Sequence, residues 1–142
     1  MEISNMSFFE ITPFDPQGGQ KNRANGISLT VCENAINIPL QTFEVIGAPK
    51  FVEVGFNRRA HIFAVKPVAT ATKISVAVTG SDHSKALGRV DICKEIEKLR
   101  NYGRKTNNLL LNDGWFDEVS GYYMFDLDKG QIVVRSFRGK RS

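Results

Sequence analysis

The sequence predicts an α+β fold that is rich in short strands and hairpins, with one short and one longer helix. Apolar and polar residues alternate over short stretches such as 27–31, 51–56 and 74–78, as they do along half-buried strands. One stretch, 91–102, instead has apolar residues at helical spacing. Gly, Pro, Asn or Asp separate these stretches, which is typical of turns.

The first 25 residues are expected to form an irregular arm. They contain Pro13, Pro16 and the pair Gly18 and Gly19, and they have few periodic apolar residues. No run in the chain approaches the roughly 18 apolar residues of a membrane helix. The first residues are also too polar for a secretory signal. These features indicate a soluble, cytoplasmic protein.

Residues 27–67 predict a strand, a turn, a second short strand, a helix and a hairpin. The turn is Glu33–Asn34, and the short helix starts at Pro39 and ends before Gly47. The hairpin pairs residues 51–56 with 61–65 and stops at Pro67.

The second half predicts a similar order of elements. A strand at 74–78 precedes a helix that Asp91 caps and Gly103 ends. Residues 104–114 are expected to be a connector. A strand at 119–127 then turns at Asp128-Lys129-Gly130 and returns through 132–134 as a hairpin.

The stretch from Ile27 to Pro67 resembles the AbrB-like, or swapped-hairpin, DNA-binding domain. The turn Glu33-Asn34, the segment Ile36-Asn37-Ile38-Pro39, the short helix ending at Ile46-Gly47 and the close at Val65-Lys66-Pro67 carry the resemblance. In that family two units interlace their hairpins to close one barrel. The resemblance therefore implies an AbrB-like unit at 26–68, a divergent second unit at 73–136, a basic tail at 137–142 and a pseudo-duplicated swapped-hairpin barrel.

The resemblance implies DNA binding, but the first unit lacks the basic residues that relatives commonly carry near the Ile-Pro step and on the short helix. This sequence has Ala35, Gln41, Phe43 and Glu44 there. A DNA-contacting surface would therefore have to come from the second half of the chain.

The net charge of +4 lies entirely in that second half. Residues 1–84 contain seven basic and seven acidic residues, and residues 85–112 contain seven basic and three acidic ones. Residues 113–128 contain five acids and no base, and residues 129–142 contain five bases and no acid. Such a footprint either binds phosphates or pairs internally with the neighbouring acids.

The basic residues of the second half are the candidate nucleic-acid contacts: Arg89, Lys94, Lys98, Arg100, Arg104, Lys105, Arg135, Arg138, Lys140 and Arg141. Tyr102 or Trp115 could stack on bases. The simpler interpretation is that Lys94 and Lys98, interspersed with Glu95 and Glu97, form the solvated face of an amphipathic helix. The alternative partner-binding residues are the acids Asp113, Asp117, Glu118, Asp126 and Asp128.

No catalytic or metal-binding constellation stands out. His61 and His83 have no partner at zinc-ligand spacing, and Ser81 to Ser84 are expected to be a polar loop. Asp126 and Asp128 have the chemistry of a hairpin turn more than that of a magnesium site. Cys32 and Cys93 are expected to be buried free thiols in preference to a disulfide.

The sequence therefore predicts a nonenzymatic protein without cofactors that binds nucleic acid, with duplex DNA favoured, as a transcriptional regulator of phage or mobile-element type. The alternative is a phage or mobile-element inhibitor of the anti-CRISPR kind, which binds a host defence nuclease by protein–protein contact. Either a monomeric pseudo-dimer or a homodimer would fit.

Overall fold

The computed structural model describes residues 9–10, 27–81 and 84–135. The strands are β2 (Phe9–Glu10), β3 (Leu29–Val31), β4 (Ile36–Ile38), β5 (Phe51–Asn57), β6 (Ile62–Val68), β7 (Ser75–Ala77), β8 (Thr79–Gly80), β9 (Lys85–Leu87), β10 (Asn107–Leu111), β11 (Trp115–Asp117), β12 (Tyr122–Asp126) and β13 (Gln131–Val134). The helices are α1 (Leu40–Val45), α2 (Val90–Leu99) and the one-turn 3-10 helix η2 (Leu127–Lys129).

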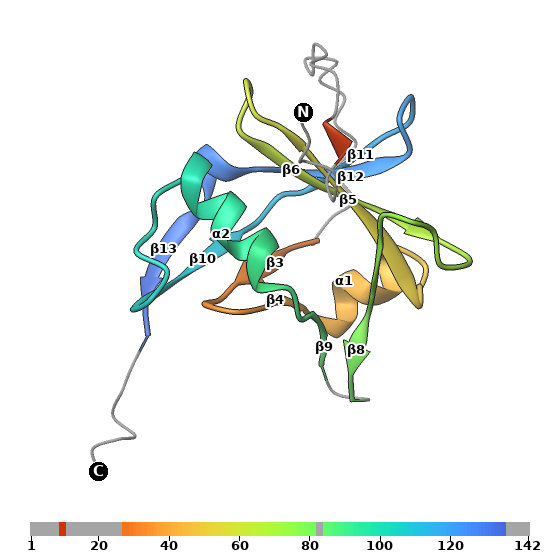
Figure 1. The fold of residues 1–142 in the computed structure, drawn as a ribbon, viewed down its shortest axis with the longest axis horizontal. Helices are drawn as coiled ribbons and strands as arrows, with labels where there is room; N and C mark the ends of the chain where they lie inside the picture. Colours follow the sequence, from red (N-terminus) through yellow and green to blue (C-terminus); the bar gives the residue numbers. More distant parts are fainter. Residues whose placement is uncertain (1–8, 11–26, 82–83, 136–142) are drawn as a thin grey trace.

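These strands form two sheets (Figure 1). The first sheet has the order β13–β10–β3–β4–β9–β8. The second has the order β11–β12–β6–β5–β2, and β7 also pairs with β5. All pairings are antiparallel except that of β2 with β5. The predicted α+β class and the strand-rich character are confirmed.

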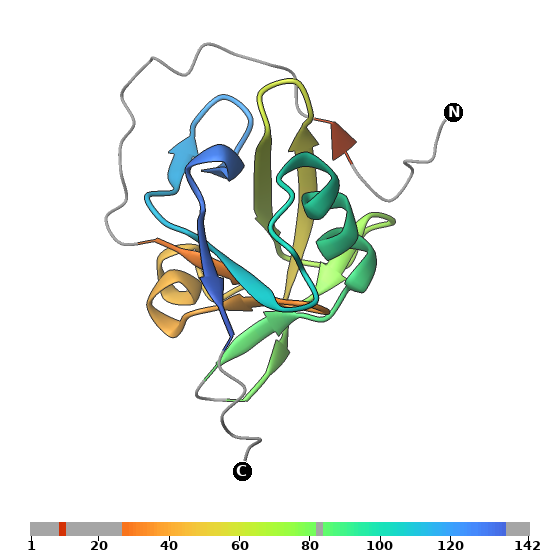
Figure 2. The ribbon, with the colours of Figure 1, turned by 90° about the vertical axis from the view of Figure 1, so that its left-hand side faces the viewer.

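The main hydrophobic core takes buried side chains from both sheets and from α2. Figure 2 shows how the ribbon of these elements is arranged. Strands with several residues in this core contribute alternate residues to it, as the period of two requires; in β5 these are Val52, Val54 and Phe56. The Phe56 and Phe63 rings meet with their centroids 5.4 Å apart. Each such fully buried side chain contributes about 1.5–3 kcal/mol to folding.

The short helix α1 is fixed to the first sheet by one buried threonine. The Thr42 hydroxyl accepts a hydrogen bond from the Ser28 backbone N–H over 2.8 Å and donates to the Ser28 carbonyl over 2.9 Å. Pro39 is the N-cap and not the first helical residue as predicted. Gly47 follows the helix at φ +98°, a conformation that glycine adopts without strain.

Helix α2 buries Ile92, Cys93 and Ile96, as the predicted spacing indicated. Asp91 does not cap it: the helix begins at Val90 after the N-cap Arg89, and the Asp91 carboxylate lies in the first turn. A carboxylate there still interacts favourably with the positive end of the helix dipole.

The second sheet also has a small apolar cluster on its other face. Alternation along β6 sends Phe63 to the main core, whereas Ile62 and Ala64 join a separate buried group with Tyr122 and Met124. Trp115 packs against this group from the neighbouring β11. The second sheet is therefore apolar on both faces, which its sequence pattern did not indicate.

The predicted connector at 104–114 is wrong, because it contains β10, a central strand of the first sheet. Leu109, which lies opposite Val31 of β3 and Ile132 of β13, and Leu111, which lies opposite Leu29 of β3, are fully buried. The strand begins with the polar Asn107 and Asn108, and its last three residues are all leucine. Its sequence therefore shows no alternation of polar and apolar residues that would predict a strand.

The predicted hairpin of 119–127 with 132–134 is also wrong. Val119 is 95% exposed in the turn between β11 and β12, which form a hairpin of their own. After β12, η2 turns the chain into the other sheet, where β13 pairs with β10. Asp126 stabilises this turn, because its Oδ1 accepts the Asp128 backbone N–H over 3.0 Å.

Pro67 does not end the predicted hairpin. Strand β6 continues to Val68, and Pro67 lies opposite Val52 of β5. On its other side β12 pairs only as far as Val65, and no other described strand pairs with that side of β6 at this point. A missing N–H is tolerated at such a position.

The two predicted units, 26–68 and 73–136, share both sheets. In the first sheet β3 and β4 lie between β10 and β9, and in the second β5 and β6 lie between β7 and β12. Neither sheet closes on itself, so a swapped-hairpin barrel is not confirmed. Of the arm at 1–25 the structure describes Phe9–Glu10, and the tail at 137–142 lies outside the described residues.

Candidate nucleic-acid interface

The structure distributes the predicted basic contacts over separate places. Arg89 lies at the start of α2, Lys94, Lys98 and Arg100 lie on or just after it, and Arg104, Lys105 and Arg135 lie near the start of β10. Arg138, Lys140 and Arg141 fall outside the described residues. The candidates therefore form at least three groups and not one continuous surface.

Arg104 and Arg135 are occupied inside the fold. The side chain of Arg104 is 11% exposed, lies 3.2 Å from Glu97 Oε1 and donates to the Glu33 carbonyl over 2.8 Å. Arg135 donates to the backbone carbonyls of Arg104 and Lys105 and lies 3.6 Å from Glu33 Oε1. These two guanidinium groups tie the β3–β4 turn to β10, which makes them structural.

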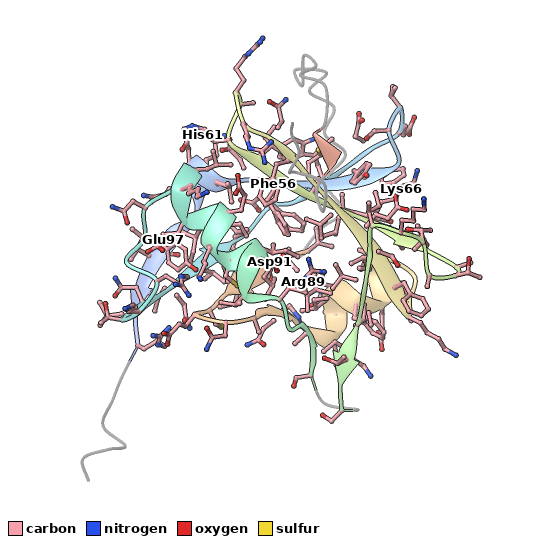
Figure 3. The ribbon with its side chains drawn as sticks, in the orientation of Figure 1. Phe56, His61, Lys66, Arg89, Asp91 and Glu97 are labelled. Carbon is pink, nitrogen blue, oxygen red and sulfur yellow. The ribbon has the colours of Figure 1, made fainter. Side chains whose placement is uncertain are left out.

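Arg89 is paired with its own helix. Its Nε and Nη2 donate to the two carboxylate oxygens of Asp91 over 2.8 and 2.7 Å, in the bidentate geometry that suits guanidinium and carboxylate (Figure 3). This hydrogen bonding lowers the pKa of Asp91 and raises that of Arg89. The pair leaves little positive field at this end of α2.

Three loops meet at the other end of α2. Arg58 Nε, in the β5–β6 turn, lies 3.0 Å from Glu95 Oε2 and joins that turn to the helix. Arg100 Nε donates to the Leu127 carbonyl over 3.2 Å and joins the helix end to η2. The Leu127 backbone N–H donates to the His61 carbonyl over 2.9 Å, which joins η2 back to the turn.

Two further contacts fix this arrangement. Arg100 Nη2 donates to the Gly130 carbonyl over 3.1 Å, so one guanidinium holds both ends of η2. His61 Nδ1 lies 2.9 Å from Asp128 Oδ1. Figure 3 shows His61 at the same end of the molecule as the C-terminal turn of α2, with Arg89 and Asp91 at the helix's other end.

We call the cations of this region the basic corner: Arg58, Arg59, Lys94, Lys98, Arg100 and Lys129. The carboxylates beside these cations all have partners: Glu95 contacts Arg58, Glu97 contacts Arg104, Asp126 accepts a backbone N–H and Asp128 contacts His61.

Four cations of the basic corner reach solvent. Arg59, Lys94 and Lys129 are exposed, and the side chain of Lys98 is 74% exposed with a loose 3.7 Å contact to Glu95. Since the acids of the region are occupied, these four side chains are the ones available to an external anion. They come from the β5–β6 turn, from α2 and from η2, so they spread over a surface and do not all lie on one helix face.

The candidate contacts taken from the sequence do not include Arg58, Arg59 and Lys129. Arg58 and Glu95, which join the β5–β6 turn to α2, are 37 positions apart in the chain. No local sequence pattern predicts a contact over this separation. The signal that existed was the adjacent pair Arg58-Arg59 in a hairpin turn, where exposed charge is common.

The predicted stacking role of Tyr102 is wrong. Its side chain is 1% exposed, and its hydroxyl donates to the Cys32 carbonyl over 2.9 Å. Trp115 is partly buried against the apolar cluster of the second sheet. Tyr102 continues the apolar spacing of α2 because its side chain packs in the main hydrophobic core.

The acidic residues proposed for a protein partner are not gathered in one place. Asp117 and Glu118 lie at the β11–β12 turn, where Asp117 Oδ2 accepts the Ser120 hydroxyl over 2.6 Å. Asp126 and Asp128 lie at the opposite end of β12. Asp113 precedes β11 at φ +58°. The five carboxylates therefore do not make a single acidic face.

The described residues contain no group of three or more His, Cys, Asp or Glu side chains that could hold a metal ion. Cys93 is buried and Cys32 is half-buried, and both are free thiols. Burial raises the pKa of the Cys93 thiol to about 12, so this thiol is protonated and unreactive near neutral pH.

Among the described residues, no helix is long and apolar enough to span a bilayer. Comparison of the chain with protein-family models, with curated proteins and with solved structures gives no match.

Proposed function

We propose that this chain is a small nonenzymatic protein that binds nucleic acid, with duplex DNA as the favoured form, through the basic corner. The observation that carries the proposal is the set of four exposed cations, Arg59, Lys94, Lys98 and Lys129, beside carboxylates that already have partners. Side chains of this kind bind phosphates and release counterions. The AbrB-like resemblance supports the same class of ligand and a regulatory role.

This surface suits the phosphate backbone more than the base edges. Three of its four exposed cations are lysines, which contribute point charges without a fixed hydrogen-bonding plane. Arg59 is the one exposed arginine of the basic corner, because the guanidinium groups of Arg58 and Arg100 are engaged within the protein. We therefore expect binding that depends weakly on sequence and strongly on salt.

The test is a fluorescence-anisotropy titration of random duplex and single-stranded oligonucleotides at several salt concentrations. With about four phosphates neutralised, log Kd should change with log salt with a slope magnitude of about 3–4. The triple variant Arg59→Gln, Lys98→Gln, Lys129→Gln should lower that slope magnitude by about 2–3 and weaken binding to all duplexes alike.

A matched control removes the same charge elsewhere. Lys50 and Lys73 are exposed near the far end of β5, and Lys85 lies on β9 with its ammonium over the Phe43 ring. The triple variant Lys50→Gln, Lys73→Gln, Lys85→Gln should leave most of the affinity and slope intact. Equal losses in both triples would show that only net charge matters, and the basic corner would lose its role.

The basic tail requires a variant of its own. Arg138→Gln, Lys140→Gln, Arg141→Gln measures its share, because these residues lie outside the described residues and the corner variants do not touch them. A loss larger than that of the corner triple would move the main phosphate contact to the tail.

The inhibitor alternative has less support, because its five carboxylates are spread over both ends of β12 and the preceding loop. It predicts no binding to duplex or single-stranded oligonucleotides even at low salt. That result would overturn the nucleic-acid proposal.

A further inference from the structure

Strand β13 is an apolar, uncharged strand at the edge of the first sheet. Of the seven large hydrophobic side chains exposed among the described residues, three are consecutive on it: Ile132 at 40%, Val133 at 43% and Val134 at 72% exposed. Edge strands usually carry charges, prolines or bulges that prevent pairing with another chain. Gln131–Val134 has none of these, and no strand of the described residues pairs with its outer edge.

The ladder between β10 and β13 shows which backbone groups face outward. The Arg135 N–H donates to the Thr106 carbonyl over 3.0 Å, and antiparallel pairs alternate between hydrogen-bonded and non-hydrogen-bonded positions. Val133 therefore bonds to β10 like Arg135. The N–H and C=O groups of Ile132 and Val134 point away from β10, and no strand among the described residues pairs with them.

We propose that two copies of this chain associate by antiparallel pairing of β13 with β13, across a two-fold axis at Val133. In this register Ile132 lies opposite Val134 of the partner subunit, and each such pair exchanges two backbone hydrogen bonds. The two outward-facing residues of each copy are then both satisfied within Gln131–Val134. A two-fold axis at Ile132 or at Val134 would satisfy only one of them within this strand.

Charge favours a second copy as the occupant. The strand is neutral, so it gives no attraction to a charged peptide, and its β-branched residues match an identical strand. In the proposed register Gln131 lies opposite Arg135 of the partner subunit, so no like charges face each other. The Arg135 guanidinium is held by Glu33 and by backbone carbonyls near the start of β10.

The pairing would join two six-stranded sheets into one continuous sheet. Since a four-residue edge buries a small area, we expect association in the range of about 1–100 µM. The inference does not depend on nucleic-acid binding, and its tests use the free protein.

Analytical ultracentrifugation of the full chain should show a concentration-dependent shift from 15.9 kDa to twice that mass. Val133→Lys should abolish the shift, because it places two like charges directly opposite each other at the axis. Val119→Lys is the matched control, since Val119 is 95% exposed in a turn away from β13, and it should dimerise like the parent. Circular dichroism checks that both variants are folded.

Cross-linking tests the register itself and does not rely on a destabilising variant. In a Cys32→Ser background, Val133→Cys should form an intermolecular disulfide on mild oxidation, because non-hydrogen-bonded antiparallel partners have Cα atoms about 4.5 Å apart. Val134→Cys should not, because the proposed register sets its two copies roughly 8 Å apart, beyond disulfide reach. A monomer at all concentrations up to about 100 µM, or equal cross-linking of the two cysteine variants, would overturn the proposal.

Discussion

Arg58 and Glu95 lie 3.0 Å apart, between Nε and Oε2, although 37 positions separate them in the chain. This contact joins the β5–β6 turn to α2 and brings an arginine pair beside the lysines of the helix. The same carboxylate lies 3.7 Å from Lys98 Nζ. Glu95 therefore both assembles the basic corner and lowers its positive potential.

Replacing Glu95 with glutamine should strengthen nucleic-acid binding. The variant frees Arg58 and Lys98 from their shared carboxylate, so the slope magnitude of log Kd against log salt should rise by up to about one. Stability should fall by at most about 1 kcal/mol, because the pair is partly exposed. Anisotropy measures the first effect and urea unfolding the second.

Glu44→Gln is the control for this variant. Glu44 is exposed on α1, and its replacement removes one negative charge, as Glu95→Gln does. If both variants raise affinity equally, local neutralisation by Glu95 is not the cause.

Thr42→Val should destabilise the fold by about 2–3 kcal/mol. The isosteric valine keeps the volume but leaves both the N–H and the C=O of Ser28 without the Thr42 hydroxyl. Thr42→Ser, which retains the hydroxyl, should lose less. Chemical unfolding compares the two; a smaller loss for valine than for serine would show that packing outweighs these hydrogen bonds.

Gly114→Ala should cost about 1–3 kcal/mol by overpacking. Gly114 is buried, and a Cβ there would contact the Phe125 ring and come within 2.9 Å of Ile27 Cδ1. Gly88→Ala provides the comparison, since nothing lies within 4 Å of its Cβ position. Equal midpoints of thermal unfolding for the two variants would contradict the expectation.

Stability should fall with rising pH above about 9, in part because of Cys93. Burial raises the pKa of its thiol from 9.0 to about 12, so between these values the unfolded chain loses a proton that the folded chain keeps. The contribution of the Cys93 thiol to the free energy of unfolding is fully present below pH 9. It is lost as pH rises to 12, by at most about 1.4 kcal/mol per pH unit.

Urea unfolding at pH 8, 9 and 10 measures the free energy of unfolding of Cys93→Ala and of the parent. This free energy should decline less with rising pH in Cys93→Ala than in the parent, whatever its value at pH 8. Parallel curves would show that this thiol does not contribute. Tyr122, whose pKa burial also raises to about 12, remains in both proteins and adds the same decline to each.

The sequence by itself determined the α+β class, the β5–β6 hairpin, the buried face of α2 and the location of the charge excess. Each depends on a local period or on composition: Val52, Val54 and Phe56 alternate, and Ile92, Cys93 and Ile96 follow helical spacing. Such patterns are visible wherever one face of an element is buried over several residues.

Only the tertiary structure decided which strands are neighbours and which cations meet. Pairing β13 with β10, not with β12, depends on η2 and on the Arg100 contacts, which connect positions about 30 residues apart. Other contacts of the fold pair Arg104 with Glu97 and Arg135 with Glu33, whereas Arg59 and Lys129 stay exposed. A sequence gives the net charge of a protein. The charge that a surface presents to a ligand depends on which carboxylates and carbonyls the fold places beside each cation.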